Sequence, residues 1–303
     1  MNISELIDKF KKIEEQVAEY RTRVEDFIKN TQRIALVYGG SGIISSSIAY
    51  WYFKLLRPEV ATFMYSIDEF IYHVAPYMQF KPDVLGVFGE GQDNNIIRLR
   101  DIGESLGLNY LILSPEIHQN VKSRIRSENI VIFNAMNNTL CMSLLLAKAI
   151  TSTITLHKTL RAKRLISEVK DFSIIAQELY DKYKEVIEDV ERLIYTTKNI
   201  LVTYTPTMLP PAYSLFYDLR LKGLDANVIN ITLALQLAQE HSQPGIGLIV
   251  FSTDVESHLV NELLFKARAR GYKVVDIRLK TDPLTAPIYG LFLSNIIVES
   301  LPR

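Results

Sequence analysis

Apolar residues follow two patterns in this chain, a helical spacing in some segments and short unbroken runs in others. From Ile3 to Phe27 they recur every three or four residues, and polar residues fill the opposite face. This spacing predicts an amphipathic helix over residues 1–30. Its apolar stripe must be buried against another surface, because a helix of this kind gains most of its stability from packing.

Between residues 31 and 158, apolar runs of strand length alternate with segments of helical spacing. The expected strands lie at 33–40, 60–66, 83–89, 109–114 and 129–134. The expected helices lie at 43–56, 68–78, 94–107 and 137–157. Strands that are apolar throughout are covered by helices on both faces, and this alternation is typical of βαβ units in a parallel sheet. We therefore expect a first α/β domain over 31–158.

A second amphipathic block, rich in Lys, Glu and Asp, predicts a helical connector over 159–197. The alternation then restarts and predicts a second α/β domain over 198–303. Its expected strands lie at 199–205, 226–231, 247–252 and 272–279, and its expected helices at 210–223, 255–271 and 285–298. The helix at 210–223 has proline in its first turn, where proline is well tolerated.

The two predicted domains resemble each other in sequence. ALVYG at 35–39 aligns with LVTYT at 201–205, and the segment 87–113 aligns with 250–277. Both alignments have an offset of about 165 residues, which is too long for a solenoid repeat. We therefore expect an internal duplication of one doubly wound α/β unit, with parallel sheets flanked by helices.

Composition narrows the class of protein. The chain has 303 residues, 48% hydrophobic and 22% charged, which is normal for a soluble protein of two domains. The formal net charge of zero argues against a broad surface for nucleic acid or for an anionic membrane. The two long apolar stretches of the chain, 140–156 and 285–298, are shorter than the roughly 20 residues of a membrane span. We expect a cytoplasmic protein that binds neither nucleic acid nor a membrane.

Reactive and metal-binding side chains are few. Cys141 is the single cysteine, so neither an intrachain disulfide nor a zinc site built on cysteines can form. It lies in an apolar run and is expected in the core. The five histidines form no HxH or HxxxH pair. We expect no metal site and no cofactor.

The segment VYGGSGIISSS at 37–47 is the main candidate for a binding site. A strand here feeds Gly39, Gly40, Ser41 and Gly42, and a helix follows. Glycines allow backbone N–H groups to converge, and the start of a helix adds partial positive charge. The pattern therefore indicates a site for an anion.

Four interpretations of this loop can be compared at the level of residues, and the first of them fails. A P-loop needs Lys and Ser or Thr after its last glycine, and Ile43-Ile44 stand there instead. A dinucleotide loop needs an acidic residue at the end of the next strand, where Tyr65-Ser66 stand, with Asp68 just beyond. A sugar-phosphate site and a simple tight turn are the other two.

The GGSG loop, the duplication and the C-terminal TDPLTAPIYGLFLSNIIV resemble the SIS (sugar isomerase) domain family. Two such domains in about 300 residues are similar to the archaeal bifunctional phosphoglucose/phosphomannose isomerases, and to the isomerase half of glucosamine-6-phosphate synthase. The resemblance covers about residues 30–303. It implies a double SIS fold, a carbohydrate-phosphate ligand and a homodimer. The apolar stripes of 3–28 and 165–194 also suggest a dimer, because they need partners.

Departures from the family pattern lie in the loop after the third strand. The family has S-x-S-G-x-T there, and this chain has FGEGQDN at 88–94. By position, this part of the candidate site consists of Glu90, Gly91, Gln92, Asp93 and Asn94. Two carboxylates near a phosphate dianion would each cost about 1–4 kcal/mol at close range. The equivalent loops of the second repeat, 205–208 and 252–257, have no glycine.

The resemblance also indicates catalytic candidates for an aldose–ketose isomerisation, which needs a base and an acid–base group. AQEHSQPG at 238–245 resembles the acid-then-histidine segment of the family, so Glu240 and His241 are candidates, and Asp225 is the nearest match to the upstream glutamate. Leu293 takes the place of the family's lysine. The sequence thus favours an isomerase or a degenerate relative. A non-catalytic regulator that senses a sugar phosphate and a nucleotide-dependent enzyme remain as alternatives.

Overall fold

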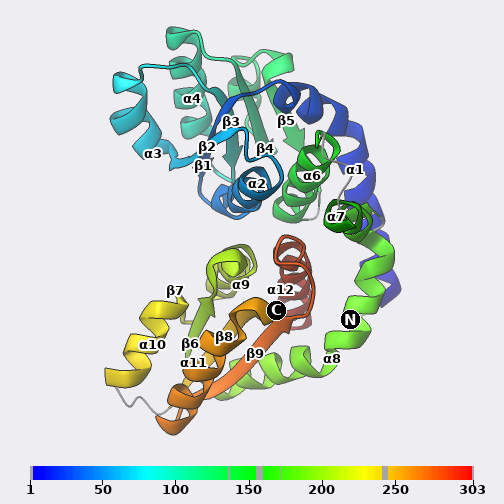
Figure 1. Cartoon of the computed structure of the whole chain (residues 1–303), viewed down its shortest axis with the longest axis vertical. Helices are drawn as coiled ribbons and strands as arrows, with labels where there is room; N and C mark the ends of the chain where they lie inside the picture. Colours follow the sequence, from blue (N-terminus) through cyan, green and yellow to red (C-terminus); the bar gives the residue numbers. More distant parts are fainter. Residues whose placement is uncertain (1–2, 136, 155–159, 171, 241–244, 302–303) are drawn as a thin grey trace. The chain divides into compact units, whose positions relative to one another are not determined.

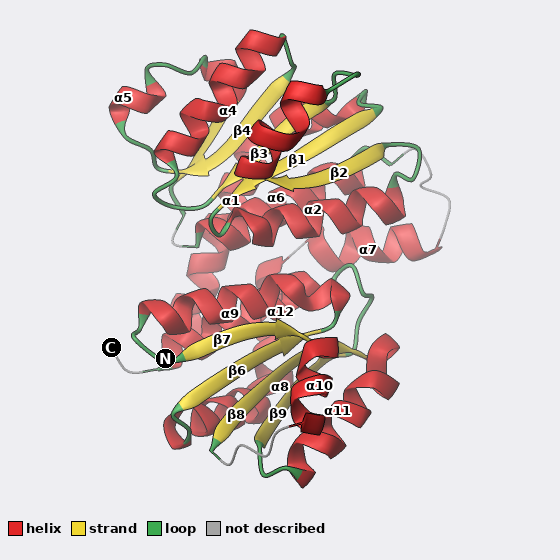
Figure 2. Ribbon diagram, turned by 90° about the vertical axis from the view of Figure 1, so that its left-hand side faces the viewer, coloured by secondary structure: helices red, strands yellow, loops and turns green. Residues whose placement is uncertain are grey.

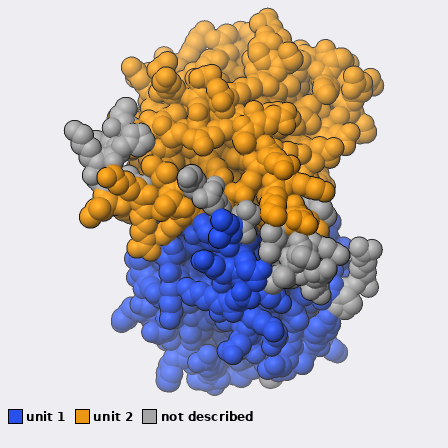
Figure 3. Space-filling model, turned by 90° about the vertical axis from the view of Figure 1, so that its right-hand side faces the viewer, with its two compact units in different colours: residues 1–7, 174–303 blue, residues 8–173 orange. Residues whose placement is uncertain are grey.

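The protein is represented by a computed structural model that describes residues 3–135, 137–154, 160–170, 172–240 and 245–301. The chain forms two compact units (Figure 3). The first unit in chain order contains residues 8–173 and is labelled unit 2 (orange) in Figure 3. The second contains residues 1–7 together with 174–303 and is labelled unit 1 (blue). Each unit is built around one parallel β-sheet, as expected for a duplicated α/β unit.

The unit of residues 8–173 contains a five-stranded sheet in the order β2-β1-β3-β4-β5, and every neighbouring pair of strands is parallel. Its strands are β1 (Arg33–Gly39), β2 (Ala61–Ser66), β3 (Asp83–Phe88), β4 (Tyr110–Pro115) and β5 (Ile130–Phe133). All six residues of β4 are buried, because helices cover both faces of the sheet.

Helices α2 and α6 cover one face of this sheet and α4 covers the other (Figures 1 and 2). The helices of this unit are α1 (Ile3–Lys29), α2 (Gly42–Leu56), α3 (Ile67–Glu69), α4 (Asp93–Leu106), α5 (Gln119–Lys122), α6 (Asn138–Ser152) and α7 (Leu160–Lys170). A π-helical turn and a 3-10 turn extend α3 to Tyr77. Gly107 ends α4 in the left-handed conformation at φ 60°, as the sequence predicted for this glycine.

The second unit has a four-stranded parallel sheet in the order β7-β6-β8-β9. Its strands are β6 (Asn199–Tyr204), β7 (Ala226–Asn230), β8 (Ile246–Thr253) and β9 (Lys273–Leu279). The order matches β2-β1-β3-β4 of the first sheet, with no counterpart of β5 among the described residues. The expected α/β fold with duplicated parallel sheets is thereby confirmed.

Helices α9 and α12 lie on one face of the second sheet, and α10 and α11 lie on the other (Figure 2). The helices of this part are α8 (Phe172–Thr196), α9 (Leu209–Leu221), α10 (Ile231–Glu240), α11 (Ser257–Ala269) and α12 (Ala286–Ser300). The sequence predicted no helix at α10. Its buried residues Ile231, Ala234 and Ala238 have helical spacing, so the signal was present but was overlooked.

The two amphipathic stripes do not need a second chain to cover them, which corrects one argument for a dimer. In α1, Phe10, Ile13, Val17, Val24 and Ile28 are all at most 4% exposed. In α7 and α8, the buried residues are Leu165, Val169, Phe172, Ala176, Leu179, Tyr183, Ile187, Val190, Leu193 and Ile194. From Phe10 onward in α1, and at the named positions of α7 and α8, the stripes are buried within the chain itself. No described helix is both long enough and apolar enough to cross a membrane.

Arg57 is a buried cation that joins three helix ends in the first unit, and its loss is expected to destabilise the protein. Its guanidinium donates to the carbonyl oxygens of Ile28 (2.8 Å) and Lys29 (3.4 Å), and to the Thr153 hydroxyl (3.4 Å). The Arg57→Met variant loses these three hydrogen bonds and the ion pair with Glu59 at 2.9 Å, at an expected cost of about 2 kcal/mol in unfolding free energy. Urea unfolding measures this.

A surface arginine provides the matched control for Arg57. The Arg192 side chain is 72% exposed and, within the described ranges, pairs only with Asp189 one helical turn away. The Arg192→Met variant should unfold within about 0.5 kcal/mol of the wild type. If both variants unfolded at the same urea concentration, Arg57 would not hold these helix ends together.

The thiol of Cys141 should not react in the folded protein. The side chain is 0% exposed in α6, and burial raises its pKa from 9.0 to about 12. Because only the thiolate reacts, a thiol reagent at pH 8 should modify the protein only after denaturation. The raised pKa also means that folding stability is lost as pH rises from about 9 to 12. Labelling of native protein at the rate of denatured protein would contradict this burial.

Candidate functional site

The candidate site lies at the carboxyl ends of β1 and β3, which are neighbours in the first sheet. The strand order reverses between these two strands, since β1 leads to β2 on one side and β3 leads to β4 on the other. Ligands of open α/β sheets bind in the crevice at such a switch point. The loop after β1 (39–42, the first glycine loop) and the loop after β3 (89–92, the second glycine loop) both emerge there.

The two glycine loops touch each other. The backbone N–H of Gly89 donates to the carbonyl oxygen of Gly39 at 2.9 Å. A Cβ atom on Gly89 would lie 2.2 Å from the Ser41 hydroxyl oxygen, so only glycine allows this approach. The structure thus brings together both groups of predicted binding residues, one from each loop, although they are about 50 positions apart in sequence.

Three backbone N–H groups in the first glycine loop have no partner among the described residues, although Gly42 itself is buried. Gly40 has φ 57°, a left-handed conformation that turns the chain into α2. Within the described part of the chain, the N–H groups of Gly40, Ser41 and Gly42 make no hydrogen bond to the protein. Ser41 is the N-cap of α2, yet its side chain caps no N–H group. These donors and the helix dipole favour an anion.

The second glycine loop leads into α4, which also starts without a side-chain cap. Gly91 is exposed and has φ 70°, and no heavy atom lies within 4 Å of the place that a Cβ atom would take. The half-buried side chain of Gln92 lies against the first glycine loop, because a Cβ atom on Gly40 would lie 3.1 Å from its Nε2. Gln92 therefore belongs to the same site as Gly40.

The two carboxylates of this loop differ in their surroundings. Glu90 is exposed and has no partner among the residues that the structure describes. Asp93 accepts a hydrogen bond from the backbone N–H of His118 at 3.4 Å, and its other oxygen lies 3.6 Å from His118 Nε2. This interaction offsets part of the Asp93 charge. Asn94 is exposed at the start of α4.

The equivalent position of the second unit is closed by a carboxylate of the protein. Glu256 accepts hydrogen bonds from the backbone N–H of Thr253 at 3.3 Å, from the Thr253 hydroxyl, and from the Thr207 hydroxyl at 3.4 Å. Thr253 and Glu256 thereby form a capping box. A residue of the chain already satisfies these donors, so an external anion has less to gain here.

The three catalytic candidates belong to the other unit from the glycine loops. Asp225 precedes β7, at the edge of the sheet opposite the carboxyl ends, and pairs with Arg220 at 3.3 Å. This placement favours a structural turn residue. Glu240 is the exposed last residue of α10 and accepts from Gln236 at 3.0 Å. His241 lies outside the described residues.

Leu293, at the position of the family's lysine, is 1% exposed in α12. A leucine cannot transfer a proton, and its burial shows that the position serves the core. Among the catalytic candidates, the described residues therefore retain only Glu240 as an exposed acid without an ion pair.

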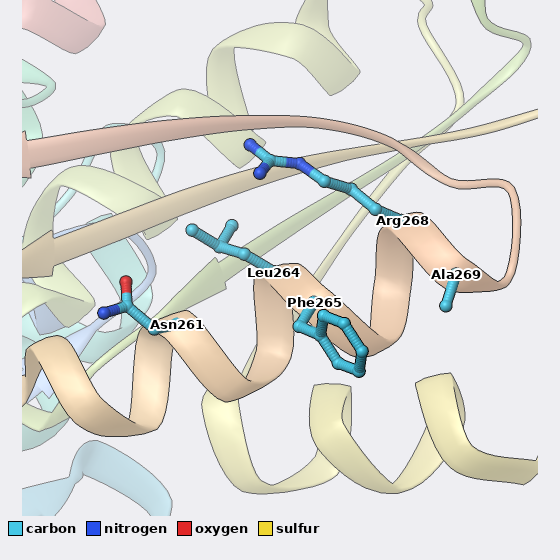
Figure 4. A pocket seen from close by; sticks show the side chains of 5 residues that line it. All are labelled: Asn261, Leu264, Phe265, Arg268 and Ala269. Carbon is cyan, nitrogen blue, oxygen red and sulfur yellow. The ribbon is translucent and has the colours of Figure 1, made fainter.

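A depression of about 420 Å³ lies on α11 of the second unit. It is lined by Asn261, Leu264, Phe265, Arg268 and Ala269 (Figure 4). Phe265 is 74% exposed, and the lining is largely apolar. None of these residues belongs to the two glycine loops, so the depression is not part of the candidate site.

Several residues of the site were not singled out from the sequence. Gly89 was not recognised as the contact to Ser41, although its spacing of two residues from Gly91 was a signal. His118 and Glu256 were also missed, because their partners come from other segments of the chain. Only the folded arrangement of the loops shows these contacts.

Comparison with known proteins gives matches in structure alone. No family model matches the chain, and no curated protein is similar to it in sequence. A candidate phosphosugar isomerase from Salmonella typhimurium LT2 is 14% identical, with 94% of each chain covered and a TM-score of 0.71. A candidate sugar-binding protein from the same bacterium is 11% identical over 99% of this chain and 100% of its own, also with a TM-score of 0.71.

A further solved structure has a similar fold. The tagatose-6-phosphate ketose/aldose isomerase from Escherichia coli is 12% identical over 97% of this chain and 91% of its own, with a TM-score of 0.62. These likenesses span both units of the chain. They confirm the fold of two SIS-type α/β domains that the sequence predicted, and at such identities they establish the fold alone.

Proposed function

We propose that this chain belongs to the SIS family and binds a phosphorylated sugar, with the phosphoryl group at the two glycine loops. The observation that carries the proposal is the set of N–H groups at Gly40, Ser41 and Gly42, which have no partner in the described protein and meet at the β1/β3 switch point. The solved structures of similar fold include sugar-binding and sugar-phosphate proteins, which supports a ligand of this class.

The negative charge of Glu90 in the second glycine loop restricts which sugar phosphates fit the proposed site. Glu90 carries an uncompensated charge near the opening of the site, so it disfavours a second anionic group on the ligand. The exposed amide of Asn94 can bind sugar hydroxyls instead. A monophosphorylated sugar, or one with an amino group near Glu90, fits these side chains better than a bisphosphate does.

Ligand-induced stabilisation tests the proposal directly. Fructose-6-phosphate at about a hundredfold over its dissociation constant should stabilise the folded protein by about 2.7 kcal/mol, visible as a rise in melting temperature. Unphosphorylated fructose should give a much smaller rise, because it lacks the anion. NAD and ATP are included as competitors. A rise with a nucleotide but none with a sugar phosphate would favour a nucleotide-dependent enzyme and contradict the proposal.

We further propose that the protein binds sugar phosphate without efficient aldose–ketose isomerisation. Leu293 is buried where the family has lysine, and Asp225 is paired with Arg220. Proton transfer would then depend on Glu240 and His241 alone. A coupled assay for conversion of glucose-6-phosphate into fructose-6-phosphate should show no turnover above background. Turnover that Glu240→Gln abolishes would favour the isomerase instead.

The likeness to the archaeal bifunctional isomerases remains an expectation from the sequence motifs. We also expect a homodimer, because the histidine of the family often reaches the site of the neighbouring subunit. Light scattering on the purified protein should give twice the mass of one chain.

A further inference from the structure

The side-chain amide of Gln92 lies over the peptide between Gly39 and Gly40. A Cβ atom on Gly39 would lie 2.9 Å from Gln92 Oε1, and one on Gly40 would lie 3.1 Å from Gln92 Nε2. The two ends of the amide differ, since one accepts hydrogen bonds and the other donates them. Which end faces a ligand therefore changes what the site can bind.

A chain of hydrogen bonds along α4 fixes the orientation of this amide. Arg98 can only donate, and its Nη1 donates to Asn95 Oδ1 at 2.9 Å. The Nδ2 of Asn95 consequently points the other way and donates to Gln92 Oε1 at 2.7 Å. With its oxygen occupied, Gln92 retains Nε2 as a donor that has no acceptor in the described part of the chain.

Arg98 is itself held in place by the segment that follows β2. Its Nη1 also donates to Asp68 Oδ1 at 3.1 Å, and its Nη2 donates to the Tyr72 hydroxyl at 3.0 Å. The guanidinium lies 5.3 Å from the centre of the Tyr72 ring. These contacts fix the position of the Arg98 guanidinium, which in turn fixes the orientation of the Asn95 and Gln92 amides.

We propose that Gln92 donates a hydrogen bond from Nε2 to a phosphoryl oxygen of the bound ligand, and that Asn95 and Arg98 are positioning residues that hold the amide in this orientation. This inference rests on the proposed function above. The second glycine loop contains no hydroxyl residue, so a neutral amide donor takes that role. Together with the N–H groups of Gly40 and Ser41, Gln92 surrounds the anion with donors only.

A double-mutant cycle tests this relay, with fructose-6-phosphate and inorganic phosphate as probes and calorimetry as readout. The Gln92→Met variant keeps the length of the side chain but loses the donor, and it should bind both probes about tenfold more weakly. Asn95→Leu should weaken binding by a similar factor when Gln92 is unchanged. It should have no further effect when Gln92 is already Met, because Asn95 acts only through Gln92.

Ser105→Ala on the same helix is the control and should bind like the wild type, since among the described residues Ser105 bonds only to the carbonyl oxygen of Asp101. Unchanged binding by Gln92→Met would overturn the inference, and so would losses from Gln92→Met and Asn95→Leu that multiply. A loss seen with fructose-6-phosphate but not with phosphate would overturn the phosphoryl contact. A wild type that binds no sugar phosphate would overturn the proposed function as well.

Discussion

The Gly42→Ala variant is expected to lose about 3 kcal/mol of unfolding free energy together with its affinity for sugar phosphate. A Cβ atom at Gly42 would lie 2.0 Å from the carbonyl oxygen and 2.7 Å from the carbonyl carbon of Val87. Both atoms belong to the backbone of β3, which cannot move without breaking the central strand pairing. The start of α2 would be pushed away from β3, and the N–H groups of the first glycine loop would move with it.

Urea unfolding and calorimetry measure the two effects of Gly42→Ala. The matched control is Gly223→Ala, because Gly223 has φ 78° and no heavy atom within 4 Å of the place that a Cβ atom would take. An alanine at this position would have a strained backbone but would not clash. We therefore expect a loss of about 1 kcal/mol in unfolding free energy and normal binding of sugar phosphate. Equal stability losses in the two variants would show that the contact between Gly42 and Val87 is not critical.

Ser41→Asp is expected to weaken sugar-phosphate binding about a hundredfold. Ser41 is the N-cap of α2, and in the proposed site its neighbours Gly40 and Gly42 donate to the anion. A carboxylate there would itself accept from these N–H groups and would repel a phosphate a few ångströms away, by about 2–4 kcal/mol at an effective dielectric constant near 20. The new carboxylate would also lie at the start of α2, where the helix dipole favours a negative charge, so the unliganded protein should keep or gain stability.

Ser41→Asn separates the charge from the size of the new side chain. Asparagine has the same shape as aspartate, but it is neutral. It should lose no more than about tenfold in affinity. If both variants bound sugar phosphate as tightly as the wild type, the anion would not lie at the first glycine loop.

Most of the fold could be predicted from the pattern of apolar residues. The runs at β1, β3 and β4 are apolar throughout because helices cover both faces of their sheet, and this burial is visible in the sequence. Two expectations were less accurate. Helix α10 was overlooked between two strands, and the stripe of α1 was assigned to a second chain although it is buried within this one.

The candidate site was predicted in part. Gly40 and Gly91 were identified because turns with a left-handed backbone conformation favour glycine, which is visible in the sequence. The role of Glu256 could not be predicted, because a capping box depends on where the 3-10 turn begins and on the distance to Thr207. The hydrogen-bonded series from Arg98 to Gln92 likewise depends on side-chain positions along one face of α4.

The sequence by itself determined the strands and most of the helices, the duplication and the glycine loops. Each of these is a local requirement, for burial at a fixed period or for a backbone angle that only glycine adopts freely. Only the tertiary structure decided which residues meet at the switch point. Contacts between Gly89 and Ser41, and between Asp93 and His118, join segments that are far apart in the chain. Such contacts depend on how strands and helices pack, which no local pattern records.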